Sequence, residues 1–70
     1  MTPAEQRYYS LSYDKKKDAR KVLEILNRER KFGFPVSVVI KTLSKKYDKD
    51  VIEIAGALLM EDSKISRRAR

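Results

Sequence analysis

The chain has 70 residues, with 17 Lys/Arg against 10 Asp/Glu for a net charge of +7, and it contains no cysteine and no histidine. A chain of this length forms one domain with a small core, because it buries only about 60% of the surface that its unfolded form exposes. This argues against a deep substrate cleft, and the composition excludes a disulfide framework, a thiolate metal site and histidine-based catalysis.

The first residues carry the signals of a helix start. The segment Thr2-Pro3-Ala4-Glu5 combines a Thr N-cap, a Pro at the first helical position and a Glu three residues after the cap. We therefore predict a short helix over residues 3–10 that loosens near Leu11. The alternation of apolar residues and serines over residues 9–13 offers an extended segment as the alternative.

The strongest periodicity follows. Asp14 can cap a helix that ends near Lys31, and its apolar positions fall at i, i+3, i+4 and i+7. These positions are Ala19, Val22, Leu23 and Leu26.

A second amphipathic helix is predicted over residues 35–46. Gly33 suits a left-handed residue at the end of the preceding helix, and Pro35 suits the first turn of the next one. Phe32 and Phe34, on either side of Gly33, are interpreted as a hydrophobic clasp between helices in preference to the alternative, a ligand-binding pair. The apolar positions of this helix are Val36, Val39, Ile40 and Leu43.

A last helix is predicted over residues 49–62, with Asp48 as its cap. Gly56 costs about 1 kcal/mol of helix propensity, and a close approach of another helix would compensate for that cost. The expected buried stripe consists of Val51, Ala55, Leu58 and Leu59, widened by Ile52 and Ile54.

Charge is sorted along the chain. Residues 1–47 carry twelve Lys/Arg against five Asp/Glu, residues 48–62 carry one lysine against five acids, and residues 63–70 carry four cations and no acid. The last helix is therefore acidic and lies between a basic body and a basic tail. This pattern indicates two contact surfaces of opposite sign.

The basic residues form the candidate nucleic-acid contact. Such a surface would hold phosphates without reading sequence, and its affinity would fall steeply with salt. The alternative is a solvated helix face partly neutralised by Asp18, Glu24 and Glu29. With Lys41 adding to the positive count, the candidate residues are Lys15, Lys16, Lys17, Arg20, Lys21, Arg28, Lys31, Lys45, Lys46, Arg67, Arg68 and Arg70.

The N-terminal tyrosines and the basic tail each allow two interpretations. Tyr8, Tyr9 and Tyr13 lie near the lysine run, as in proteins that stack single-stranded bases, but aromatic residues in so short a chain also supply the core. Residues 65–70 form either an electrostatic arm that orders on binding or a disordered chain end.

The acidic helix is the candidate contact for a protein partner, through Asp50, Glu53, Met60 and Glu61. Catalysis is not expected, because neighbouring acids at helix ends do not face each other across a substrate. Both glycines are isolated, so no phosphate-binding loop is present, and no spaced acidic loop suits calcium. We expect no enzyme activity, cofactor, metal or small-molecule substrate.

The apolar pattern from about Asp18 to Ile65 resembles the helix-turn-helix core of winged-helix and related DNA-binding domains. This resemblance implies a compact three-helix bundle, here with a short N-terminal helical segment and a disordered basic tail: a domain over residues 1–64 and a tail over residues 65–70. The few residues after the third helix leave no room for a wing. The outward positions of that helix include acids, so base reading through it is not expected.

In size, charge and helical organisation the chain also resembles the small accessory subunit of the crenarchaeal B-family replicative DNA polymerase. That resemblance implies a protein that joins the polymerase and modulates DNA synthesis without chemistry of its own. The charge sorting likewise favours an accessory subunit over a free-standing, chromatin-like DNA-binding regulator or a ribosome-associated RNA-binding protein. Few Asn and Gln, many Lys and no Cys are typical of thermophile proteins. We expect a cytoplasmic protein, because no apolar run is long enough to span a bilayer and the N-terminus has no hydrophobic signal region.

Overall fold

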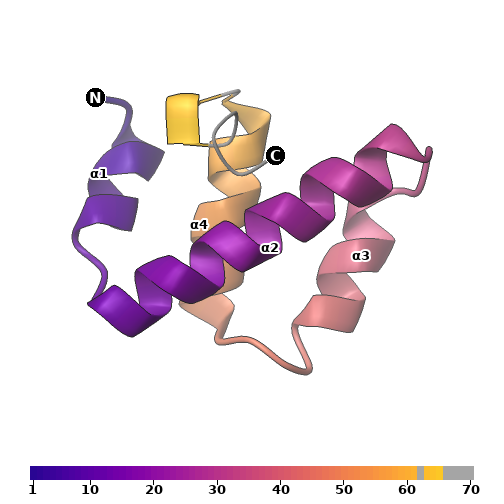
Figure 1. Ribbon diagram of the computed structural model, residues 1–70, viewed down its shortest axis with the longest axis horizontal. Coiled ribbons are helices and arrows are strands. Elements are labelled where there is room, and N and C mark those ends of the chain that lie inside the picture. The colour runs from indigo at the N-terminus through magenta and orange to yellow at the C-terminus, as the bar shows by residue number, and fades with distance from the viewer. Residues whose placement is uncertain (62, 66–70) are drawn as a thin grey trace.

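The computed structural model describes residues 1–61 and 63–65, and these residues form an all-α fold with no β-strand among them. The predicted helical class is confirmed. Helix α2 lies across α4, with α1 at one end of the molecule and the α2–α3 turn at the other (Figure 1). The helices are α1 (Pro3–Tyr9), α2 (Tyr13–Lys31), α3 (Val36–Leu43) and α4 (Lys49–Met60).

Helix α1 begins with the predicted capping box. The Thr2 hydroxyl accepts the Glu5 N–H at 3.2 Å, and the Glu5 carboxylate accepts the Thr2 N–H at 3.0 Å. The latter bond lowers the pKa of Glu5. Ala4 and Tyr8 are buried in the common core, so this helix is an integral part of the fold. Of the residues 9–13 for which the extended alternative was offered, Tyr9 and Tyr13 lie in α1 and α2, and Ser12 between them has an extended backbone.

Helix α2 begins one residue after Ser12, and the prediction that Asp14 caps it is wrong. Ser12 has an extended backbone, and its hydroxyl accepts the Lys15 N–H at 3.4 Å. Asp14 lies instead in the first turn, where the helix dipole favours a negative charge. The helix ends at Lys31 as predicted. Its four predicted core positions, Ala19, Val22, Leu23 and Leu26, are fully buried.

Helix α3 is shorter than predicted. It begins at Val36, so that Pro35 occupies the N-cap position, and it ends at Leu43 rather than at residue 46. Leu43 is its last apolar position facing the core. Residues 44–46 are exposed and turn, and the Lys46 N–H donates to the Leu43 carbonyl at 2.9 Å.

Helix α4 begins after Asp48, as predicted, but the Asp48 side chain makes no capping hydrogen bond. The carboxylate of Asp50 instead accepts the Val51 N–H at 2.9 Å. The helix ends at Met60, two residues before the predicted end. Its six predicted apolar positions, Val51, Ile52, Ile54, Ala55, Leu58 and Leu59, are all buried.

Two further expectations are corrected at this end of the fold. A Cβ at Gly56 would meet only the Ile40 Cδ1 atom, at 3.7 Å, which is an ordinary contact, so no close helix approach requires this glycine. Ile65, assigned above to the tail, is buried with the core, because the chain turns back after α4 with the Ser63 N–H donating to the Leu58 carbonyl.

Candidate nucleic-acid interface

A stripe of exposed cations runs along the outward face of α2. It follows five positions, four occupied by cations and the middle one by a glutamate. Successive positions are four, three, four and three residues apart, which places them on one side of a helix with 3.6 residues per turn. The stripe spans about 21 Å from its first to its last Cα at 1.5 Å per residue. We call Lys17, Lys21, Arg28 and Lys31, together with the Glu24 that lies among them, the basic stripe; all five are exposed.

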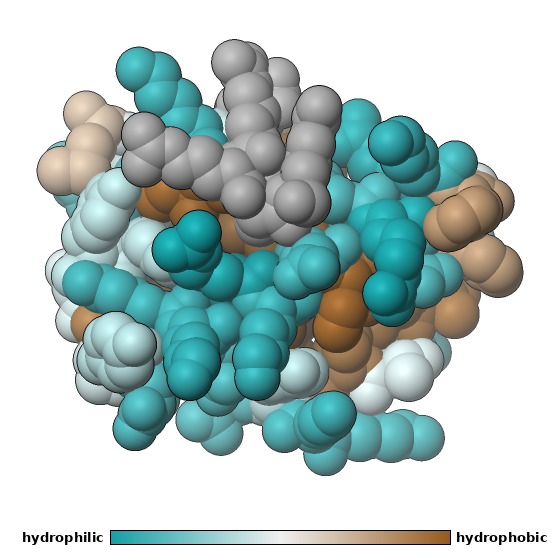
Figure 2. All heavy atoms as spheres, viewed as in Figure 1, coloured by the Kyte–Doolittle hydropathy of each residue, from teal (hydrophilic) through white to brown (hydrophobic). Residues whose placement is uncertain are grey.

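The stripe lies opposite the side of α2 that packs on the core. Figure 2 shows hydrophilic side chains along the diagonal band that α2 follows across this view. Within the part of the chain that the structure describes, Lys17, Lys21 and Lys31 form no salt bridge. Arg28 approaches its neighbour Glu29 at 3.6 Å. Among the described residues, three of the four cations therefore have no salt bridge that must break before they bind a phosphate.

Lys15 does not belong to the stripe, although the sequence grouped it there. Its ammonium donates to the Asp50 carboxylate of α4 at 2.7 Å. This hydrogen bond raises the pKa of Lys15 and lowers the pKa of Asp50. The pair joins α2 to the start of α4, so Lys15 has a structural partner.

Lys16 and Arg20 lie near tyrosines of α1, although Arg20 is itself exposed. The Lys16 ammonium lies 5.6 Å from the centroid of the Tyr9 ring, within cation–π range. Burial raises the pKa of Tyr8, and the Arg20 guanidinium beside its hydroxyl opposes that shift. Lys16 therefore contacts α1 directly, and Arg20 lies beside Tyr8 of that helix.

The remaining predicted cations are not gathered into one surface with the stripe. Lys41 and Lys45 are exposed on α3 and on the turn after it, and the Lys46 ammonium lies 5.8 Å from the Tyr47 ring centroid. The three tail arginines, Arg67, Arg68 and Arg70, lie outside the described residues.

The predicted acidic docking surface is partly neutralised within the fold. Asp50 is held by Lys15, and Glu53 lies 3.8 Å from Arg7 and 3.9 Å from Lys49. At the other end of α4, Met60 is 82% exposed and Glu61 is exposed. Of the four predicted partner residues, Asp50 and Glu53 therefore lie against cations within the fold, whereas Met60 and Glu61 are exposed.

The turn between α2 and α3 corrects the prediction of a phenylalanine clasp. Phe32 is 74% exposed and Phe34 is 55% exposed, and neither joins the core. Gly33 has a φ of 86°, the left-handed conformation predicted for it. Figure 2 shows hydrophobic side chains at this end of the molecule.

The aromatic residues near the N-terminus divide between core and surface. Tyr8 is buried and meets Tyr9 edge-on, with ring centroids 5.2 Å apart. Tyr9 is half-exposed, whereas Tyr13 is 77% exposed at the start of α2. The core interpretation is confirmed for Tyr8, and Tyr13 remains accessible beside the first cation of the stripe.

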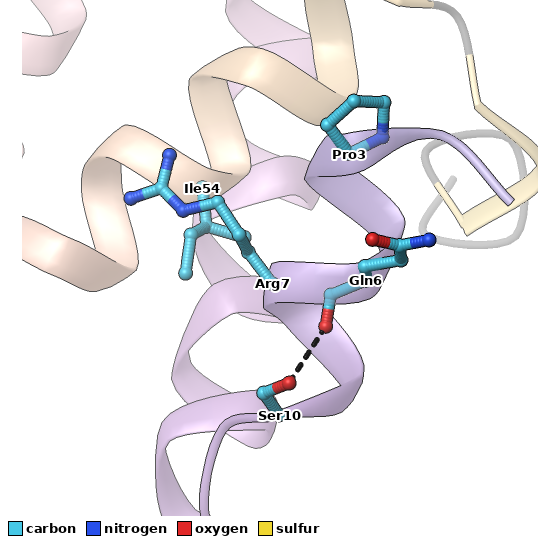
Figure 3. A pocket seen from close by; sticks show the side chains of 5 residues that line it. All are labelled: Pro3, Gln6, Arg7, Ser10 and Ile54. Atoms are coloured by element: carbon cyan, nitrogen blue, oxygen red, sulfur yellow. Dashed lines mark hydrogen bonds between the residues drawn. The ribbon is translucent and has the colours of Figure 1, made fainter.

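A hollow between α1 and α4 offers no catalytic arrangement. It is lined by Pro3, Gln6, Arg7, Ser10 and Ile54 (Figure 3). The Ser10 hydroxyl donates to the Gln6 carbonyl at 2.9 Å, so it is bound to its own helix, and Arg7 faces Glu53. Among residues 1–61 and 63–65, acidic side chains nowhere gather in threes as a metal site would require.

Comparison of the chain with protein-family models, with curated proteins and with solved structures returned no match. None of the described helices combines the length and the apolar character needed to cross a membrane. Function is therefore inferred from the geometry of the exposed side chains.

Proposed function

We propose that this protein is a non-enzymatic accessory subunit of a nucleic-acid-processing complex that holds nucleic acid, without reading its sequence, through the basic stripe of α2. The observation that carries the proposal is the line of exposed cations, three of which have no salt-bridge partner among the described residues. The resemblance to the small subunit of a replicative DNA polymerase makes DNA replication the specific context that we favour.

The physical basis is release of counterions. Each cation that neutralises a phosphate lowers the logarithm of the binding constant by about 0.9 per tenfold rise in salt on duplex DNA, and by about 0.7 on a single strand. Four contacts from Lys17, Lys21, Arg28 and Lys31 correspond to a slope of about −3 to −4. Such a surface holds the backbone of any sequence.

The proposed docking surface for the larger subunit is the open end of α4, at Met60 and Glu61. Asp50 and Glu53 already have cationic partners, and a docking contact would have to break those pairs. An exposed methionine adapts to varied apolar surfaces. We include the helix-turn-helix type arrangement of α2, α3 and α4 in this proposal, without base reading by α4.

Substitution of the stripe tests the nucleic-acid contact. Lys17→Gln/Lys21→Gln/Lys31→Gln should reduce the salt slope by about 2 to 3 and, at 0.1 M salt, weaken binding about a hundredfold on a single strand and about five-hundredfold on a duplex. The matched control, Lys41→Gln/Lys45→Gln/Lys64→Gln, removes the same charge from exposed residues off the stripe. Equal losses in both triple variants would show a net-charge effect and refute the stripe as a defined contact.

The accessory role is tested by purifying the tagged protein from its host with and without exhaustive nuclease treatment. A large polypeptide retained in stoichiometric amount after nuclease, and lost on Met60→Asp, is the expected result. Loss of every partner on nuclease treatment would leave a free-standing nucleic-acid binder, and recovery of ribosomal particles would indicate an RNA-binding role.

A further inference from the structure

Two phenylalanines project into solvent at the end of α2 where the basic stripe finishes. Phe32 follows Lys31 directly, and Phe34 lies two residues after Phe32. Both rings are more than half exposed. Phenylalanine has no polar atom that water could satisfy, so a pair of exposed rings beside cations indicates a ligand with both apolar faces and negative charge.

The exposure of Phe34 has a local structural cause. The Phe34 N–H donates to the Glu29 carbonyl at 3.0 Å and the Gly33 N–H donates to the Arg30 carbonyl at 3.1 Å, which is the hydrogen-bond pattern of a Schellman motif. In that motif the residue at the Phe34 position commonly packs on an apolar residue one turn back. Here the residues one turn back are Arg28 and Glu29, so the apolar partner usual in this motif is missing and 55% of Phe34 stays exposed.

The same bonds hold the turn in a defined shape. The Phe32 N–H donates to the carbonyls of Arg28 and Glu29, at 3.3 and 3.1 Å. Gly33 between the rings adopts the left-handed conformation that other residues avoid. The two phenylalanines are therefore presented by an ordered backbone, which reduces the entropy lost when a ligand stacks on them.

Charge around the turn favours a polyanion. Arg28, Arg30 and Lys31 occupy the last turn of α2. Glu29 is the carboxylate among them, and it approaches Arg28 at 3.6 Å. A nucleic-acid strand whose phosphates lie along the stripe would therefore reach the two rings next to these cations.

We propose that the turn Phe32-Gly33-Phe34 is a stacking platform for unpaired bases, so that the ligand of the stripe is single-stranded nucleic acid. This rests on the proposed function of the stripe. In a duplex the base faces are occupied by their neighbours, whereas an unpaired base can lie on an aromatic ring. The rings carry no hydrogen-bonding group, so stacking on them does not select a base sequence.

The geometry sets the length of strand that the site covers. The stripe spans about 21 Å, which corresponds to about six phosphates at the spacing of about 3.4 Å in a stacked strand. Bases at the Phe32 end extend this to about eight nucleotides, within the range known for single-strand binders. Affinity should therefore rise with oligonucleotide length up to about eight nucleotides and then level off for one protein per strand.

The test compares fluorescence anisotropy of labelled oligothymidylate and of a labelled duplex, with Phe32→Ala/Phe34→Ala against the wild type. Loss of stacking should weaken single-strand binding about fivefold to a hundredfold for each ring that stacks. The salt slope and the duplex affinity should not change, because no phosphate contact is removed. Phe32→Trp/Phe34→Trp should retain single-strand affinity.

Val38→Ala is the matched control. Val38 is an exposed apolar residue on α3 that lacks an aromatic ring, so its removal should not affect single-strand affinity. An unchanged single-strand affinity in the phenylalanine variant, or equal losses on single strand and duplex, would overturn the stacking platform.

The two proposals fail separately. If the lysine triple variant of the stripe loses binding while the phenylalanine variant does not, the phosphate contact stands and stacking is refuted. If neither variant changes affinity, the proposed function is refuted as well. If the phenylalanine and Val38 variants instead release a protein partner and leave single-strand affinity unchanged, the turn is a protein-docking surface and the stacking proposal is wrong.

Discussion

Glu24 interrupts the basic stripe, and its replacement gives the sharpest test of the interface. It lies three residues after Lys21 and four before Arg28, on the same exposed side of α2. A strand held by those two cations passes over the carboxylate, which repels its phosphates. Glu24→Lys removes this repulsion and adds a fifth phosphate contact.

The magnitude follows from counterion release. One added contact steepens the salt slope by about 0.9 on duplex and about 0.7 on single-stranded DNA. At 0.1 M salt this amounts to about an eightfold gain on a duplex and about a fivefold gain on a single strand. Glu24→Gln removes the repulsion alone, so it should tighten binding without changing the slope.

The assay is a salt titration of affinity by fluorescence anisotropy for the wild type and both variants. Glu61→Lys is the control, because it makes the same change in net charge at an exposed residue of α4. The reasoning is refuted if Glu61→Lys tightens binding as much as Glu24→Lys does, since affinity would then follow net charge alone. It is also refuted if Glu24→Lys leaves the salt slope unchanged.

Two further predictions concern stability. Gly56→Ala should stabilise the fold by about 1 kcal/mol, raising the melting temperature by about 4–8 °C in calorimetry, because alanine favours the helix and its Cβ meets only Ile40 at an ordinary distance; a lower melting temperature would mean that the helices pack too closely there for a methyl group. Asp50→Asn should flatten the acid limb of stability: the pKa of Asp50 is held below its ordinary value of 3.8, so its contribution is present above that pH and is lost as the pH falls through the folded-state pKa. Melting curves from about pH 5 to pH 2 check this, and identical acid limbs in the two proteins would show that the Lys15 pair does not stabilise the fold.

The sequence alone predicted the helices and most of the core, because these features depend on spacing within one segment. The apolar positions of α2 and α4 repeat at helical intervals, and the capping box at Thr2 and the left-handed Gly33 follow from local chemistry. Helices α3 and α4 end two or three residues earlier than predicted. Residues 44–46 and Glu61, which follow these helices, are polar or charged and compatible with a helix, but they are exposed and contribute no core contact that would extend it.

Only the tertiary structure decided which cations are free of partners in the described part of the fold and exposed for contact with nucleic acid. Lys15 and Lys17 look equivalent in the sequence, yet a helix turns by about 100° per residue, so one meets Asp50 of α4 and the other faces outward. Phe32 and Phe34 were interpreted from the sequence as a hydrophobic clasp between helices. The folded chain leaves both outside the core, because the hydrogen bonds of the turn fix the backbone at positions that no other helix of the described residues covers fully.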